Sequence, residues 1–240
     1  MTDGVDILCI VAHPDDAEIA AGGTIALHVD RGYRVGIVDL TRGEMGTRGN
    51  AELRDLESAA ASKVLGISFR ENLDLGDGVF HSGVEHRMKV MTAIRKWRPS
   101  IVITNALDDR HPDHGKAAAL VAEACFYSGL PKMITYAEGV EQAAWRPGAV
   151  YHMIQDYYQE PDFVIDVTPF WDKKMEALRC YSSQFYDPSS NEPITPISGP
   201  DFFDFLISRA VEFGRPSGMR LAEGFVSSRR FGVKDLHDLI

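Results

Sequence analysis

The chain has 240 residues, of which 45% are hydrophobic and 10% aromatic, and its formal net charge is −10. This size and apolar content suffice for a large core, so we expect residues 1–240 to form a single domain. The negative charge disfavours general binding to nucleic acid, and no apolar run reaches the ~20 residues of a membrane span. The three scattered cysteines and the lack of a basic signal-peptide start predict a cytoplasmic protein without a disulfide framework.

The first predicted strand, Ile7–Val11, ends in a polar turn. Its five residues are all apolar, which is typical of a central strand in a parallel sheet that helices cover on both faces. His13, Asp15 and Asp16 follow it, at the edge where open α/β sheets bind their ligands. A helix is expected from Ala17 to Val29, and an alternative role for either aspartate is to cap that helix.

The rest of the chain alternates between predicted strands and helices. Strands are expected at 34–40, 67–75, 101–104, 149–154 and 163–167. Helices are expected at 51–65, 84–97, 116–127 and 202–213, with one more through residue 178 and a loop at 188–200. This alternation predicts right-handed crossovers and an α/β fold with a mostly parallel sheet.

A second polar cluster follows the predicted strand at 101–104 and contains His111 and His114. These two histidines are three residues apart, as are His13 and Asp16, so each pair shares a face on a helical first turn. Two imidazoles and one carboxylate around an open position suit zinc, and the same set suits ferrous iron. His13, Asp16, His111 and His114 are four candidates for three coordination positions. The remaining histidine and Asp15 would then lie beside the metal and could act as acid and base in hydrolysis.

Motifs of several other enzyme classes are absent. The sequence has no dinucleotide-binding glycine fingerprint after the first strand, no serine-hydrolase elbow and no phosphate-binding lysine loop. Arg42, Arg48, Arg54 and Arg110 fall in or near the loops at the carboxyl edge. In an acidic protein they indicate an anionic substrate group, because arginine grips a carboxylate by two parallel bonds. The alternative for Arg54 is an ion pair with a nearby glutamate.

Four segments resemble the LmbE-like (PIG-L) N-acetylglucosamine deacetylase family: Ala12–Glu18, Gly22–Thr24, Thr41–Glu44 and His111–His114. The resemblance is strongest in the first half of the chain. Four further segments look like the bacillithiol-biosynthesis branch, which deacetylates N-acetylglucosaminyl-malate: Asp39–Gly49, Arg70–Leu73, Gly218–Phe225 and Val233–Leu236.

The resemblance implies a Rossmann-like three-layer α/β/α sandwich and a zinc-dependent N-deacetylase. The metal ligands that it implies are His13, Asp16 and His114. The catalytic residues that it implies are the general base Asp15, the assisting acid or oxyanion stabiliser His111, and Asp113, which would orient His111.

Substrate contacts are less well marked, and we expect Arg54, Glu44 and Arg110 to touch the sugar or malate. The expected partner is a small GlcNAc conjugate with an anionic aglycone, without nucleic acid or membrane partners. The family's frequent homo-oligomers, many of them hexamers, predict a homo-oligomer. Two alternatives stay open: the same reaction on another GlcNAc amide, such as a chitooligosaccharide or mycothiol-type precursor, and a non-catalytic metal- or sugar-binding protein. A GlcNAc-malate substrate predicts a basic pocket near the metal, whereas a chitin substrate predicts an open groove with exposed aromatic side chains.

Overall fold

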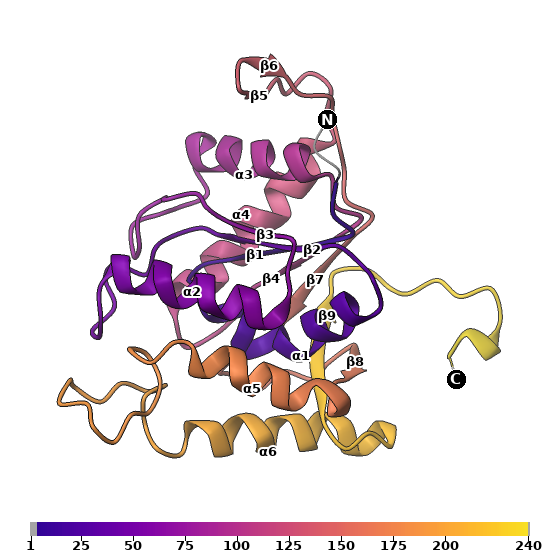
Figure 1. Ribbon diagram of the computed structural model, residues 1–240. Coiled ribbons are helices and arrows are strands. Elements are labelled where there is room, and N and C mark those ends of the chain that lie inside the picture. The colour runs from indigo at the N-terminus through magenta and orange to yellow at the C-terminus, as the bar shows by residue number, and fades with distance from the viewer. Residues whose placement is uncertain (1–3, 240) are drawn as a thin grey trace.

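A seven-stranded sheet between two layers of helices forms the centre of the protein, in a computed structural model that describes residues 4–239 (Figure 1). The strand order is β3-β2-β1-β4-β7-β9-β8. The strands are β1 (Ile7–Val11), β2 (Val35–Asp39), β3 (Phe69–Asn72), β4 (Ile101–Thr104), β7 (Ala149–Met153), β8 (Phe163–Asp166) and β9 (Ala222–Ser227). All pairings are parallel from β3 to β7, while β9 runs antiparallel to both of its neighbours. The predicted α/β/α fold with a mostly parallel sheet is confirmed.

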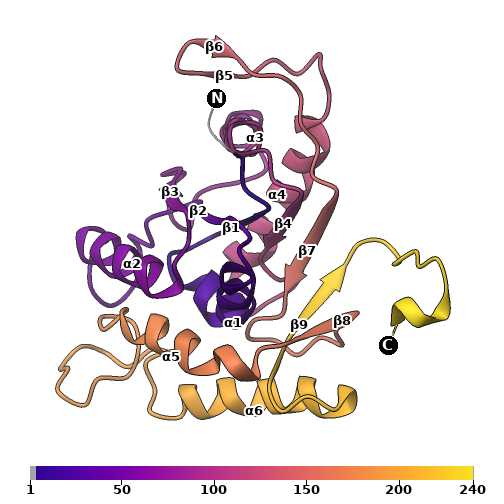
Figure 2. The same ribbon diagram turned by 45° about the vertical axis from the view of Figure 1, so that its right-hand side comes forward.

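Each face of the sheet has its own layer of helices and its own apolar core. On one face lie α1 (Asp16–Asp30), α2 (Ala51–Leu65) and α5 (Trp171–Arg179), with α6 (Phe202–Gly214) beside α5. On the other face lie α3 (Val84–Trp97) and α4 (Pro112–Ser128), as Figure 2 also shows. Short 3-10 helices occur at Thr168–Phe170, Arg215–Ser217 and Leu236–Leu239. None of the helices within residues 4–239 has the length and apolar content to cross a membrane.

The strand β1 lies in the middle of the parallel part, between β2 and β4. Ile7, Cys9 and Val11 enter the core beneath α1 and α2, whereas Leu8 and Ile10 enter the core beneath α3 and α4. Both faces of β1 are therefore buried, which is why its sequence is apolar without alternation.

Four local features differ from the sequence-based expectation, one of them being β3, which is limited to Phe69–Asn72 within the range expected at 67–75. The strand β9 and the hairpin of β5 (Tyr136–Ala137) and β6 (Val140–Glu141) were not predicted. The helix α4 begins at Pro112, four residues earlier than expected. A proline suits this first helical position, because the amide that it lacks would have no partner inside the helix.

Candidate active site

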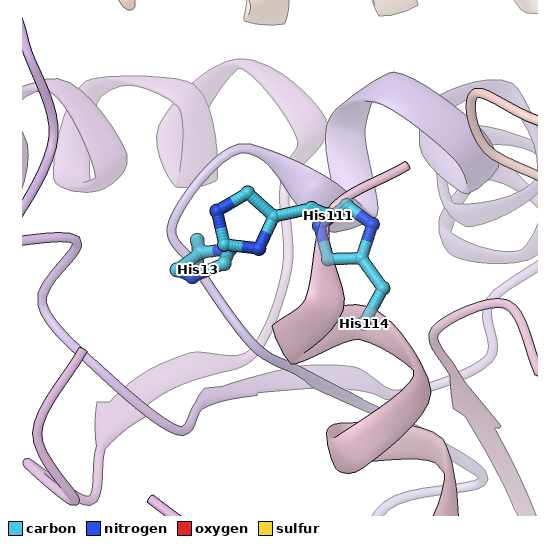
Figure 3. A group of neighbouring side chains, drawn as sticks. All are labelled: His13, His111 and His114. Carbon is cyan, nitrogen blue, oxygen red and sulfur yellow. The ribbon is translucent and has the colours of Figure 1, made fainter. Parts of the chain in front are cut away.

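Two polar segments meet where the carboxyl ends of β1 and β4 lie side by side. From β1 the chain continues to β2 on one side, while β4 lies on the other side. Such a topological switch point is where open α/β sheets bind ligands. His13 follows β1, and His111 and His114 lie at the start of α4. Figure 3 shows the three imidazole rings gathered in one region, with ring centroids 4.7, 5.2 and 5.6 Å apart.

The three histidines lie close enough to share one cation. One ring nitrogen from each lies within 4.8 Å of the others. The carboxylate of Asp16 joins them: its Oδ1 is 3.0 Å from His114 Nε2, and its Oδ2 is 3.5 Å from His13 Nδ1. The structure therefore brings together all four side chains that the sequence offers as metal ligands, including His111.

The charges around these histidines favour a cation. Burial lowers the pKa of an imidazole, but hydrogen bonds to three carboxylates, led by Asp113, outweigh it and raise the pKa of His13 well above its ordinary value. Burial also lowers the pKa of His114, but Asp16 and Asp109 outweigh this effect and raise that pKa to about 9. Carboxylates that stabilise two buried imidazolium groups can also stabilise one divalent metal ion bound to the neutral imidazoles. The residues therefore fit the metal that the resemblance implies.

Hydrogen bonds from neighbouring side chains hold the candidate ligands in place. His114 Nδ1 bonds the carboxylate of Asp109, which directs Nε2 toward Asp16. Asp16 also accepts hydrogen bonds from Asn105 Nδ2 at 2.9 Å and from Gln155 Nε2 at 3.0 Å. A carboxylate that fixes the second ring nitrogen is a common support for metal-binding histidines.

Asp15 stands beside this cluster in a strained backbone conformation. Its φ of 111° lies in the left-handed region, which residues other than glycine rarely adopt and which is enriched at functional sites. Its side chain makes no hydrogen bond that caps α1, so the capping role is not observed for Asp15. Burial raises the pKa of Asp15 to about 7, although Arg54, whose Nη2 lies 3.1 Å from Oδ2, opposes the shift. Such a pKa suits a general base near neutral pH.

His111 and Asp113 interact differently from the expectation. His111 Nδ1 accepts a hydrogen bond of 3.3 Å from the main-chain amide of Asp113. The Asp113 carboxylate instead accepts from Gly78 N and Lys116 Nζ, each at 2.8 Å, and one oxygen lies 3.7 Å from His13 Nε2. Within the described residues, the main chain of Asp113 rather than its side chain contacts the His111 ring.

A cavity of about 430 Å³ opens above these side chains. Of the three residues expected to contact substrate, Arg54 and Arg110 belong to its wall. Each is already paired with a carboxylate: Arg54 with Asp15, and Arg110 with Asp156, at 2.9 Å from its Nε. The guanidinium group of Arg54 is therefore held in a buried ion pair, whereas the Arg110–Asp156 pair is exposed and uses Nε alone, so it holds Arg110 only weakly.

Glu44, the third expected substrate contact, lies outside the cavity wall. Its carboxylate accepts hydrogen bonds from the main-chain amides of residues 42 and 77, and so joins two loops beside the site. The two remaining loop arginines are also paired. Arg42 bonds Asp55 at 2.6 Å, and Arg48 Nε lies 3.4 Å from Glu192. Hence each of the four arginines that the sequence singles out has a carboxylate partner.

Four polar side chains of the site were given no role from the sequence, although Asn105 and Asp109 lie within the second polar cluster: Asp77, Asn105, Asp109 and Gln155. Asn105 and Gln155 lie just after β4 and β7, so their position at the carboxyl end of a parallel strand is a signal that would have found them. Asp77 lies in a glycine-flanked turn, and its Oδ1 is 3.1 Å from His13 Nε2. No local pattern marks that contact, because it depends on how two distant loops fold together.

An α/β/α fold with a histidine–carboxylate cluster at its switch point is typical of a metal-dependent hydrolase. The family model described as "PIG-L: GlcNAc-PI de-N-acetylase" matches residues 8–125. The diacetylchitobiose deacetylase of Thermococcus kodakarensis is 33% identical over 232 residues, which is 91% of this chain and 81% of that protein. The chain belongs to the PIG-L family, and the expectation of an enzyme of the N-deacetylase class is confirmed.

Other relatives show that the family contains several activities. The 4-oxalmesaconate hydratase of Pseudomonas putida is 31% identical, with 74% of this chain and 73% of that protein covered. A probable N-acetyl-alpha-D-glucosaminyl L-malate deacetylase of Bacillus anthracis is 28% identical, with 75% and 81% covered. The bacillithiol branch is thus one of several kinds of relative.

Solved structures agree with this family assignment. A conserved protein of Thermus thermophilus has a TM-score of 0.84 and 34% identity, over 96% of this chain and 98% of that one. The N,N'-diacetylchitobiose deacetylase of Pyrococcus horikoshii has a TM-score of 0.78 and 26% identity, over 98% of this chain and 88% of that one.

Proposed function

We propose that this protein hydrolyses the N-acetyl group of an N-acetylglucosamine-type amide in a metal-dependent reaction. The observation that carries the proposal is the buried carboxylate of Asp15, held in a strained conformation directly beside the histidine–carboxylate cluster. A protein that only binds metal or sugar needs no such group there. Relatives named as deacetylases of GlcNAc-containing compounds support the same reaction.

We assign metal binding to His13, Asp16 and His114. Asp16 lies between the two imidazoles, and His114 has the second hydrogen bond expected of a metal ligand. Zinc is the metal we propose, and ferrous iron suits the same ligands. When bound, the metal supplies a Lewis acid that makes water acidic and polarises the acetyl carbonyl.

The remaining residues perform the proton transfers. Asp15 accepts the proton of the attacking water, and its pKa of about 7 suits this step. His111, which forms part of the cavity wall, stabilises the oxyanion, and the proton that Asp15 took from water passes to the departing amine. The C–N bond then breaks, and the products are acetate and the free amino sugar.

The group attached to the sugar separates the candidate substrates. Relatives act, by name, on diacetylchitobiose, on a GlcNAc-malate conjugate and on a GlcNAc-inositol conjugate. The resemblance to the bacillithiol branch predicts GlcNAc-malate, and the arginines near the carboxyl edge gave additional support for an anionic group. Because Arg54 is held in a buried pair, one support for an anionic group is lost, and we propose diacetylchitobiose-type conjugates first and GlcNAc-malate of bacillithiol biosynthesis second.

The direct test is acetate release by metal-loaded protein from GlcNAc, diacetylchitobiose and GlcNAc-malate, with and without a chelator. We expect turnover of at least one of them, lost on chelation and restored by zinc or ferrous iron. The Asp15→Asn variant is the matched control, because it alters the proposed base and none of the proposed ligands. Fully metal-loaded protein that releases no acetate from any of the three would refute the proposal.

A further inference from the structure

We propose that Arg209 is a positioning residue of the metal site. It fixes the short segment 155–157, and this segment orients two of the proposed ligands, Asp16 and His114. The inference rests on the metal site of the proposed function and adds to it a side chain that touches neither the metal nor the substrate. Arg209 lies on α6 (Figure 1), behind the cavity wall that the segment helps to form.

The segment 155–157 directs polar groups toward both ligands. Gln155 Nε2 donates a hydrogen bond of 3.0 Å to Asp16 Oδ1. The next two main-chain amides donate to Asp109 Oδ1 at 2.9 and 2.8 Å, and the other carboxylate oxygen of Asp109 bonds His114 Nδ1. The segment therefore holds a carboxylate ligand directly and an imidazole ligand through Asp109. Supporting contacts of this kind determine how metal ligands are oriented.

Arg209 binds the main-chain carbonyls of the same segment. Its Nη1 donates to the Gln155 carbonyl at 2.9 Å, and its Nη2 donates to the Asp156 carbonyl at 2.8 Å. Because the guanidinium fork is planar and rigid, two bonds to successive carbonyls fix the direction of the backbone between them. The segment is thus held through its amides by Asp109 and through its carbonyls by Arg209.

Aromatic rings fix the guanidinium group of Arg209 itself. Its Cζ lies 4.8 Å from the ring centroid of Phe205, 5.8 Å from that of Phe213 and 5.9 Å from that of Tyr158. Phe205 and Phe213 lie on α6, four residues before and after Arg209, so they share its side of the helix. Rings at such distances attract a guanidinium cation and restrict its position. The support is therefore in place without a bound metal, as a preorganised site requires.

Loss of the guanidinium group would leave two carbonyls without their partner and allow the segment to shift. Asp16 and His114 would then lose part of their orientation, and the metal would bind less tightly. Direct supports of metal ligands typically contribute about 10- to 100-fold in metal affinity. Because Arg209 acts one contact further from the metal, Arg209→Met should weaken metal binding by about tenfold.

The test is the dissociation constant of the full chain for zinc, measured by competition with a chromophoric chelator. Arg95→Met is the matched control. Arg95 is buried and likewise donates to main-chain carbonyls, those of Ser128, Leu130 and Met133. These carbonyls lie at the carboxyl end of α4 and just after it, whereas His114 lies at the start of that helix.

Arg209→Met should raise the Kd for zinc about tenfold and change the visible spectrum of the cobalt-loaded protein, because that spectrum depends on ligand geometry. Arg95→Met should lower the melting temperature but keep the wild-type Kd and spectrum. Arg209→Lys keeps the charge but not the fork that binds both carbonyls, so its Kd should rise by a smaller factor, about threefold. This milder variant decides the question if the methionine variant does not fold.

The outcomes separate this inference from the proposed function, because the measured quantity is metal binding. Wild-type affinity and spectrum in the Arg209 variants, or equal losses of affinity in Arg209→Met and Arg95→Met, would overturn the positioning role. Wild-type protein that binds zinc but releases no acetate would refute the deacetylase and leave the inference standing. Wild-type protein that binds neither zinc nor cobalt would overturn both.

Discussion

Replacing Arg54 with methionine is expected to weaken catalysis on charged and uncharged substrates alike. Arg54 Nη2 donates to the Pro14 carbonyl and to Asp15 Oδ2, and the Arg54 and Asp15 side chains are both buried. The charge nearest to Arg54 is therefore the proposed general base. The competing view, in which Arg54 binds an anionic part of the substrate, has two supports: Arg54 belongs to the cavity wall, and its Nε has no hydrogen-bond partner among the described residues.

The size of the effect follows from the burial of this pair. Breaking a buried ion pair by removing one partner destabilises a protein by about 3–5 kcal/mol if the other charge remains. Asp15 can avoid this cost by taking up a proton, because burial already raises its pKa to about 7 while Arg54 opposes the rise. Loss of Arg54 moves the pKa of Asp15 further upward, and a protonated Asp15 cannot act as a base. Since one pKa unit corresponds to about a tenfold change in the ionised fraction, kcat/KM at pH 7 should fall about 10- to 100-fold.

The assay compares kcat/KM of wild type, Arg54→Met and Arg54→Lys on the methyl glycoside of GlcNAc and on GlcNAc-malate. The methionine variant should lose activity in equal proportion on both substrates, and the loss should shrink as the pH rises. Lysine restores a positive charge but not the two-point geometry of the guanidinium group, so it should recover only part of the activity. Metal content and melting temperature control for damage to the fold. A loss confined to GlcNAc-malate would show that Arg54 binds the substrate, and would refute our reasoning.

Metal binding, base function and core stability each give one further prediction. His114→Ala removes a proposed ligand and should sharply lower metal content by elemental analysis, whereas a full complement of metal would exclude His114 as a ligand. Asp15→Asn cannot accept a proton, so it should keep its metal and lose about 10²-fold or more in kcat; wild-type turnover would contradict the role. Lys174 Nζ bonds Glu223 at 2.7 Å in the core, and Glu223 also accepts from the amides of Gly23 and Thr24, so Lys174→Met should lower the free energy of unfolding in urea by about 1–3 kcal/mol. Adding Glu223→Gln should recover part of that loss, and no recovery would show that the pair is not the cause.

Local patterns predicted the elements with a clear apolar run or marked ends, including the edge strand β8, which was expected at 163–167 and found at Phe163–Asp166. The helix bounds expected for α2 and α3 agree with the structure. Asn50 caps α2 and Gly66 ends it, while α3 ends before Arg98 and Pro99 and begins after Gly83 without a side-chain cap.

The strand β9 was missed, because Glu223 and Gly224 interrupt its apolar pattern. Glu223 is buried there with a partner, Lys174, that lies 49 residues away in sequence. A buried charged residue in a strand can be predicted only when its distant partner is known.

At the site, too, the sequence spacing predicted which side chains meet, whereas the ion pairs between distant residues were not predicted. Residues three apart at two strand ends predicted that four potential ligands would meet, since strand ends and helix starts fix their directions. The count of arginines near that edge suggested a basic pocket, but a count says nothing about partners. Arg54 and Asp15 are 39 residues apart in sequence, and Arg110 and Asp156 are 46 apart. In an acidic chain a buried arginine is more stable beside a carboxylate than alone, so pairing within the protein is the physical default. A buried pair such as Arg54–Asp15 withdraws its arginine from ligands, whereas the exposed pairs of Arg42 and Arg110 hold theirs only weakly. Equal losses on both substrates in Arg54→Met would therefore mean that pairing, rather than the number of arginines, determines what this cavity binds.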